Sequence, residues 1–452
     1  MSSISETGSQ PSIIEIPRLV RVFICAAICV LLAELIGAVT VPLGGAYKVV
    51  LLPLLWALLI GAIWGLAKPV VSDRIAIDNG LQSIAATALQ PALLLFVAKL
   101  GLLVGGSLPK ILNSGWALVF QEFGHFFGTM VFGLPVALLL GIKREAIGAT
   151  FSVGREPSLA IIGEKYGMAS AEGRGVLAEY MTGTVFGAVF IAILAGVLSS
   201  LGWFDPLALA MGAGVGSGSM MAAASGAIAA QQTAEVAKEV AAFAAASNLI
   251  TTTIGTYFTL FLSLPFTVWA YGVLEPILGR GKEDTSATSK FSDPPPTESP
   301  ADPARLSPLQ LLSVWVISSA MALIGNYLAY KTIPDAQVIG GLAIIIAVVI
   351  LGHGIYTLTK GVVPAVVWVS LLAMTLTYPG MPFSAEIAAL TGKINFLALA
   401  TPLLAFAGLS IAKDVPVFRK LGWRIVLVSL MANAGTFIGA ALIAQLFMHK
   451  PA

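Results

Sequence analysis

The sequence has few charged residues and almost no cysteine or histidine. Of its 452 residues, 11% are charged and 57% are hydrophobic, and the mean hydropathy is +0.92. Soluble globular domains carry about 25% charged residues, so this composition excludes an ordinary soluble protein. The net charge of +2 says little about partners, and we expect no nucleic acid partner. The expected surroundings are a lipid bilayer.

Catalytic and metal-binding motifs are also missing. Cys25 and Cys29 lie one helical turn apart in an apolar stretch, which favours packing as small apolar groups over a disulfide or a metal site. There are three histidines, and H-E-x-x-H, paired aspartates and a serine with a nearby histidine do not occur at a workable spacing. We therefore expect no enzyme activity, no catalytic residues, no metal site and no cofactor.

What the sequence does contain is a series of apolar stretches of about 20 residues, the length of a membrane-crossing helix. The first begins near Leu19 and is too long for a signal peptide core, so we expect it to be retained. The predicted fold is an all-α polytopic membrane protein with about 11 transmembrane helices. These spans are predicted near 19–41, 48–67, 84–105, 115–141, 176–200, 240–274, 308–330, 336–359, 362–378, 395–412 and 423–447.

Basic residues in the loops predict the orientation. Residues 279–307 are polar and rich in proline, which predicts a flexible linker. The linker falls on the side that the excess of Lys and Arg marks as cytoplasmic, and the expected location is the bacterial inner (plasma) membrane. The residues that define this side are Arg18, Arg21, Lys68, Arg74, Lys143, Arg144, Arg280, Lys282, Lys290 and Arg305, whereas the opposite loops carry single lysines at Lys48, Lys110 and Lys331.

Two apolar regions, 146–168 and 205–230, are too broken by glycine and proline to be ordinary spans. The second contains GAGVGSGSMMAAASG at 212–226, which fits neither G-x-G-x-x-G nor G-x-x-x-x-G-K-[ST] and is therefore not a phosphate loop. Inside a bilayer, broken backbone is tolerated only where protein or a water-filled cavity satisfies its polar groups. We expect both regions to be re-entrant hairpins.

Internal similarity predicts two sets of repeats. A Gly-Trp pair precedes a Gly-Thr pair by 13 residues in two places, at Gly115-Trp116 with Gly128-Thr129 and at Gly422-Trp423 with Gly435-Thr436. This match suggests that the two ends of the chain are copies. The two broken regions resemble each other, each precedes a polar-centred span, and the predicted orientation makes them inverted copies. The domains predicted are an N-terminal tail (1–18), a first scaffold block (19–145), a core block (146–278), the linker (279–307) and a second scaffold block (308–452).

The glycines and serines of the hairpins are the candidate binding site. Glycine allows a sharp turn, serine adds hydrogen-bonding groups, and half-helix N-termini attract anions. The alternative is a small-residue helix that simply packs tightly. The substrate-binding candidates are Ser152, Gly154, Arg155, Glu156, Gly214, Gly216, Ser217, Gly218 and Ser219, and the ion-coupling candidates are Glu179, Asn248, Thr251, Thr252 and Thr253.

Several intramembrane ionisable residues have more than one interpretation. Arg155 either binds a substrate carboxylate or is neutralised by Glu156, and Glu179 either lines the cavity or marks the membrane interface. Glu122 and His125 stand three residues apart on one helix face and form either a proton pair or a metal half-site, or His125 is simply satisfied by a neighbouring Ser or Glu, which the lack of a second half-site favours. Like Glu34, both lie in a scaffold block. That position favours a scaffold or dimer role over a place in the site.

The hairpins, their polar-centred spans and IPDAQVIGG at 333–341 resemble inverted-repeat, elevator-type secondary transporters such as the sodium–glutamate and citrate-type symporters. The double-glycine hairpin signature of those families is missing here. The run GAGVGSGSMM also resembles an integral-membrane family of domain-of-unknown-function type. The first resemblance implies a homodimer with scaffold domains at its interface and a mobile core.

Together these features predict a secondary transporter that moves a small organic anion or an amino acid, coupled to Na⁺ or H⁺, by alternating access of the core. The alternative is a channel or pore-type export protein.

Overall fold

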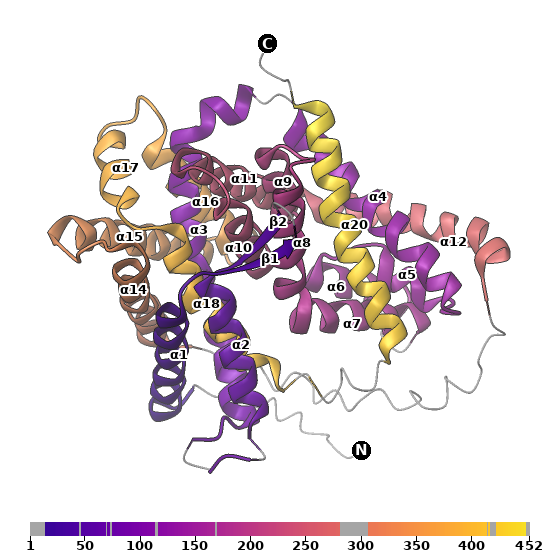
Figure 1. Cartoon of the computed structure of the whole chain (residues 1–452), viewed down its shortest axis with the longest axis horizontal. Coiled ribbons are helices and arrows are strands. Elements are labelled where there is room, and N and C mark those ends of the chain that lie inside the picture. Colours follow the sequence, from indigo (N-terminus) through magenta and orange to yellow (C-terminus); the bar gives the residue numbers. More distant parts are fainter. Residues whose placement is uncertain are drawn as a thin grey trace, which may run out of the picture.

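The structure is a computed structural model that describes residues 14–280 and 306–448, with gaps at 45–46, 69, 73–74, 114–115, 168–169, 414 and 416–421. Arg74, Lys282, Lys290 and Arg305 fall outside the described residues. The described chain is helical except for one β-hairpin (Figure 1), so the all-α class is confirmed. The hairpin pairs β1 (Val39–Gly44) with β2 (Tyr47–Leu51) in antiparallel register.

The helices of the first part of the chain are α1 (Ile16–Ile36), α2 (Pro53–Leu66), α3 (Asn79–Asn113), α4 (Ala117–Leu139), α5 (Glu145–Thr150), α6 (Arg155–Lys165), α7 (Ala171–Thr182), η1 (Gly183–Gly187), α8 (Ala188–Leu201), α9 (Pro206–Gly214), α10 (Gly218–Ala229), α11 (Ala234–Phe258), η2 (Thr259–Ser263) and α12 (Leu264–Leu278). Here η1 and η2 are π-helical turns. Such turns are rare and often occur at functional sites.

After residue 306 the helices are α14 (Pro308–Tyr330), α15 (Ala336–Leu358), α16 (Ala365–Thr377), α17 (Ser384–Gly392), α18 (Phe396–Ile411) and α20 (Trp423–Phe447). In Figure 1, α14 and α15 lie at one side of the molecule and α12 at the other. Helices α9, α10 and α11 lie between them.

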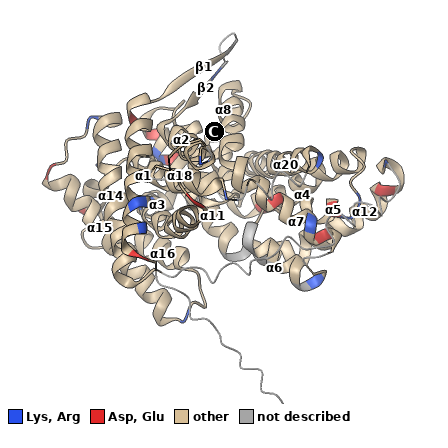
Figure 2. Cartoon of the chain, turned by 90° about the horizontal axis from the view of Figure 1, so that it is seen from below, with Lys and Arg blue, Asp and Glu red and all other residues tan. Residues whose placement is uncertain are grey.

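Eight described helical runs are long and apolar enough to cross a membrane, and a ninth is obtained if α17 and α18, bent by 58°, form one span. Few of their residues carry charge, and most of the ribbon in Figure 2 is neither acidic nor basic. The chain is therefore a multi-pass integral membrane protein.

The number of spans is lower than the sequence predicted. The stretch 48–67 is divided between β2 and α2, and α2 has only 14 residues. The stretch 362–378 contains α16, which has 13 residues. Helices of this length extend about 21 Å, which is less than the roughly 30 Å of a hydrocarbon core.

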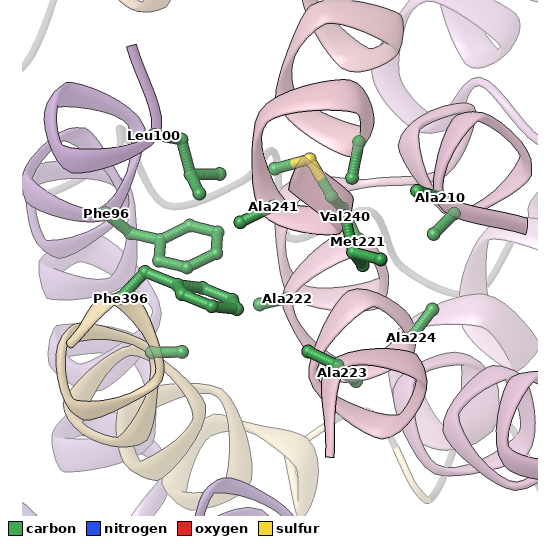
Figure 3. Packing of buried hydrophobic residues seen from close by; sticks show 14 of the residues in the cluster. Phe96, Leu100, Ala210, Met221, Ala222, Ala223, Ala224, Val240, Ala241 and Phe396 are labelled. Atoms are coloured by element: carbon green, nitrogen blue, oxygen red, sulfur yellow. The ribbon is translucent and has the colours of Figure 1, made fainter. Parts of the chain in front are cut away.

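Small side chains allow close packing around the centre. Phe96 of α3 and Phe396 of α18, with ring centroids 6.5 Å apart, lie beside Ala241 of α11 and Ala222 of α10 (Figure 3). All four are buried. Because alanine projects only a methyl group, α18 approaches α10 closely and α3 approaches α11 closely, and this packing holds the second broken region in place.

The two broken regions enter from opposite ends of the continuous helical run α7–η1–α8. At its first end, Arg174 forms an ion pair of 2.7 Å with Glu145, where α5 begins. At its last end, Gln231, just after α10, donates to Gly196 O over 2.9 Å. The first region is also connected to the start of this run, because α6 leads into α7 through a short loop. The second region is connected to the end of the run, because α8 leads into α9. Each region thus starts and finishes at the same end of this run.

Candidate functional site

A cavity of about 220 Å³ lies where the two broken regions meet. Both interruptions border it: residues 152–154 between α5 and α6, and residues 215–217 between α9 and α10. The volume suits a small metabolite, because pockets for drug-sized molecules measure about 300–1,000 Å³. The remaining wall comes from α3, α4, α11, η2, α16 and α18 through Leu89, Gln90, Leu93, Val97, His125, Asn248, Thr251, Thr252, Gly255, Thr259, Val366 and Leu403.

The first interruption is stabilised by two hydroxyl groups. Ser152 Oγ accepts from the backbone N–H of Gly154 over 3.0 Å. Ser263 of η2 donates to the carbonyl oxygen of Phe151. A Cβ on Gly154 would lie 3.0 Å from both Ser152 Oγ and Ser158 Oγ, so glycine leaves room for these hydroxyls. The first turn of α6, with Pro157 and Ser158, therefore reaches the cavity wall.

The second interruption depends on Asn248 of α11. Its Nδ2 donates to Gly214 O over 2.8 Å and to Gly216 O over 3.0 Å. Ser217 caps α10, because its Oγ accepts from the backbone N–H of Met220 over 3.4 Å. Side chains thus supply the partners that the broken backbone needs at this depth.

The first turns of α6 and α10 both border the cavity. A helix N-terminus carries about half a positive charge from its unpaired N–H groups. Among the described lining residues there is no Lys, Arg, Asp or Glu, and the two helix termini add partial positive charge to this wall. Such an arrangement favours an anionic group.

Next to the cavity lies a buried polar cluster on α4. Glu122 Oε1 accepts from Gln121 Nε2 over 2.8 Å and from Thr251 Oγ1 of α11. Glu122 Oε2 lies 3.3 Å from His125 Nδ1. The side chains of Glu122 and His125 are 0% and 2% exposed, and His125 and Thr251 also line the cavity. Thr251 therefore connects the carboxylate to the cavity wall.

The structure brings most of the predicted site residues together. Nine of the fourteen line the cavity: Ser152, Gly154, Gly216, Ser217, Gly218, Ser219, Asn248, Thr251 and Thr252. Gly214 lies behind the wall, where a Cβ would meet Ala244 O at 2.4 Å. The side chains of Arg155, Glu156 and Thr253 lie outside the described part of the structure. Their predicted roles stay predictions.

Glu179 is the predicted residue that the structure places elsewhere. Its carboxylate is 2% exposed and accepts from Asn433 of α20 over 3.3 Å. It does not appear among the described residues that line the cavity. Glu179 therefore connects α7 to α20 beside the site. The bond is charge-assisted, and the burial of the carboxylate makes this partner important.

Sequence reasoning placed Glu122 and His125 in a scaffold, yet His125 is part of the cavity wall. Glu34, the third residue assigned to the scaffold, is buried and accepts from Thr401 of α18 over 3.0 Å, away from the cavity lining. The i, i+3 spacing of Glu122 and His125 signals a paired function. No local pattern in the sequence indicates that α4 packs against α11.

These features define the class of protein: it is a multi-pass membrane protein with a central cavity between two interrupted helical regions. Residues 31–273 match the family described as "Protein of unknown function (DUF3100)". The chain belongs to this family, and the predicted membership of an uncharacterised integral-membrane family is confirmed. No curated protein and no solved structure matches the sequence.

Proposed function

We propose that this protein is a secondary active transporter that moves a small organic anion or an amino acid across the membrane by alternating access. The observation that carries the proposal is the shared cavity between two helical breaks that enter from opposite ends of α7–η1–α8. In a membrane these breaks would be re-entrant hairpins of inverted orientation. Inverted units of this kind can exchange conformations and open one site to either side in turn.

The chemistry of the wall supports an anionic solute. The N–H groups at the starts of α6 and α10 and the hydroxyls of Ser217 and Ser219 offer donors to a carboxylate. Apolar side chains such as Leu93, Val97 and Leu403 would cover the carbon skeleton. A site with a few placed polar groups and an otherwise apolar lining is typical of small-molecule binding.

The distribution of basic residues supports the proposed orientation in a bacterial inner membrane. Arg18 at the start of α1 forms an ion pair of 3.0 Å with Asp78, just before α3. Lys143 and Arg144 lie just before α5 and form ion pairs with Glu275 and Glu172. By the positive-inside rule the first hairpin enters from the cytoplasm. The second hairpin then enters from outside.

The test is uptake into proteoliposomes that contain the full-length protein. Radiolabelled acetate, lactate, succinate, citrate and glutamate are supplied separately, with an inward Na⁺ gradient, an inward proton gradient or neither. We expect at least one anion to accumulate with saturable kinetics and only with an ion gradient. Conductance without saturation would support a pore instead, and absence of both would contradict the proposal.

A matched control separates site effects from misfolding. Asn248→Ala removes the bond to the second break, whereas Gln337→Ala alters an exposed amide in the first turn of α15, away from the cavity. We expect uptake to be lost in the first variant and unchanged in the second. Equal uptake by both variants would argue against the cavity as the transport site.

A further inference from the structure

The cluster of Glu122 and His125 has one polar atom without a partner. His125 Nδ1 faces Glu122 Oε2, which selects the neutral tautomer with its proton on Nδ1. Nε2, at the other side of the ring, is buried and has no hydrogen-bond partner among the described atoms. The ring also borders the cavity. The ring therefore borders the proposed solute site, while the lone pair on Nε2 is buried and has no partner among the described atoms.

Protonation of this pair changes its charge without rearranging its existing bonds. With Glu122 ionised and His125 neutral, the pair carries one negative charge. A proton taken up at Nε2 forms an N–H bond there, and the resulting imidazolium–carboxylate pair is neutral. The negative charge beside the cavity is then removed, and a buried N–H donor takes the place of the lone pair.

We propose that Glu122 and His125 are the proton-binding pair of this protein and that the ion coupled to solute movement is a proton. This inference rests on the proposed transport function. The protonated pair attracts an anion, whereas the deprotonated pair repels it through the charge on Glu122. Proton and anion therefore favour each other's binding, as reciprocal coupling requires.

Other ionisable groups on the helices around α4 do not share this position. Glu122 is bonded to Gln121, His125 and Thr251 in the described structure. Tyr257 of α11 is 64% exposed, Tyr271 of α12 lies beside Lys143 and Glu275, and the remaining ionisable residues lie nearer to helix ends. These are Glu145 on α5, Glu235, Lys238 and Glu239 on α11, Tyr271 and Glu275 on α12, and Arg424 on α20.

The experiment measures proton movement and anion uptake together. The proteoliposomes contain the pH-sensitive dye pyranine, and the anion gradient is the only gradient imposed. They receive an equimolar mixture of acetate, lactate, succinate, citrate and glutamate. One of these anions is radiolabelled in each run. Protein-free liposomes give the correction for permeation of undissociated acids. We expect the wild type to acidify the lumen as the anion enters, with half-saturation about 10-fold lower at about pH 6 than at about pH 8.

Two variants and a control isolate the pair. His125→Gln should abolish lumen acidification and the pH dependence while leaving exchange of internal for external anion measurable. Glu122→Gln should shift the pH dependence to lower pH, because its neutral amide no longer stabilises the imidazolium of His125. His353→Gln should behave as the wild type, since His353 lies on α15 beside Trp315 and Tyr356 and does not line the cavity. Acidification that persists in His125→Gln, or uptake driven by Na⁺ alone, would overturn the proposal.

A second readout separates failure of this inference from failure of transport itself. If the wild type moves none of the five anions, the transport proposal fails, and nuclear magnetic resonance of ¹³C-labelled histidine in the detergent-solubilised chain still tests the pair. We expect the His125 signal, assigned by its loss in His125→Gln, to titrate at a pH that Glu122→Gln lowers. A His125 signal that does not titrate, or that Glu122→Gln leaves unmoved, would refute the pair as a proton site.

Discussion

Gly128 of α4 and Gly435 of α20 pack against each other's backbone in a reciprocal way. A Cβ on Gly128 would lie 2.1 Å from Gly435 O, and a Cβ on Gly435 would lie 2.1 Å from Gly128 O. One turn away, Gly124 and Gly439 show the same mutual contact. Symmetrical contacts of this kind agree with the sequence match between the two glycine–threonine pairs, and they support a duplicated origin for α4 and α20.

We predict that Gly435→Ala destabilises the protein by about 1–3 kcal/mol, because the added methyl group has no space against Gly128 O. The measurement is thermal unfolding in detergent. Gly340→Ala is the control, since its Cβ would meet nothing within 4 Å, and there the alanine should be neutral or slightly stabilising. Equal melting temperatures for the two variants would show that α4 and α20 are not packed this closely.

Asn248→Ala should impair both uptake and local order. The substitution leaves the carbonyl groups of Gly214 and Gly216 without their amide donor, and an unsatisfied buried polar group costs about 1–3 kcal/mol. Hydrogen exchange of residues 214–218 should increase, while exchange in α15 stays unchanged. Wild-type exchange in residues 214–218 would mean that Asn248 is not what holds the second break.

Alanine substitutions at Gly216 and Gly214 should distinguish an effect on uptake from an effect on packing. A Cβ on Gly216 has Met220 Cβ at 3.2 Å as its nearest neighbour, whereas a Cβ on Gly214 would lie 2.4 Å from Ala244 O. Gly216→Ala should therefore keep the thermal stability but reduce uptake, because the methyl group stands at the cavity wall. Gly214→Ala should instead lower the thermal stability. Uptake by Gly216→Ala equal to that of the wild type would show that Gly216 does not border the transport site.

Arg155→Gln tests a prediction that comes from the sequence. If Arg155 binds a carboxylate, its replacement should raise the KM for uptake about 10-fold or more, since a charged hydrogen bond contributes about 1.5–3 kcal/mol. Lys165→Gln, at the other end of α6, is the matched control and should leave KM unchanged. An unchanged KM in Arg155→Gln would assign Arg155 to neutralisation by Glu156 instead.

The sequence predicted the membrane class and the position of both breaks, because glycine and serine at 152–154 and 212–219 interrupt otherwise apolar helices. It missed the β-hairpin at 39–51, since a short apolar run rich in valine does not distinguish a strand from part of a helix.

The position of His125 at the cavity was not predicted. Local patterns reveal which residues share a helix face, but only the packing of α4 against α11 brings His125 to the cavity. The same holds for Glu179, which the structure connects to Asn433, far away in the sequence.

The most direct test of the account is labelling of cysteines placed at the two breaks. Cys25 and Cys29 are buried and can be replaced by alanine, after which Ser152→Cys and Ser217→Cys are made separately. A membrane-impermeant maleimide is then applied from either side of the vesicle, with and without a transported anion. We predict that each cysteine reacts from both sides and that the anion protects both. Reaction of each position from one side only, or protection of one position alone, would contradict a single site that opens alternately to the two sides.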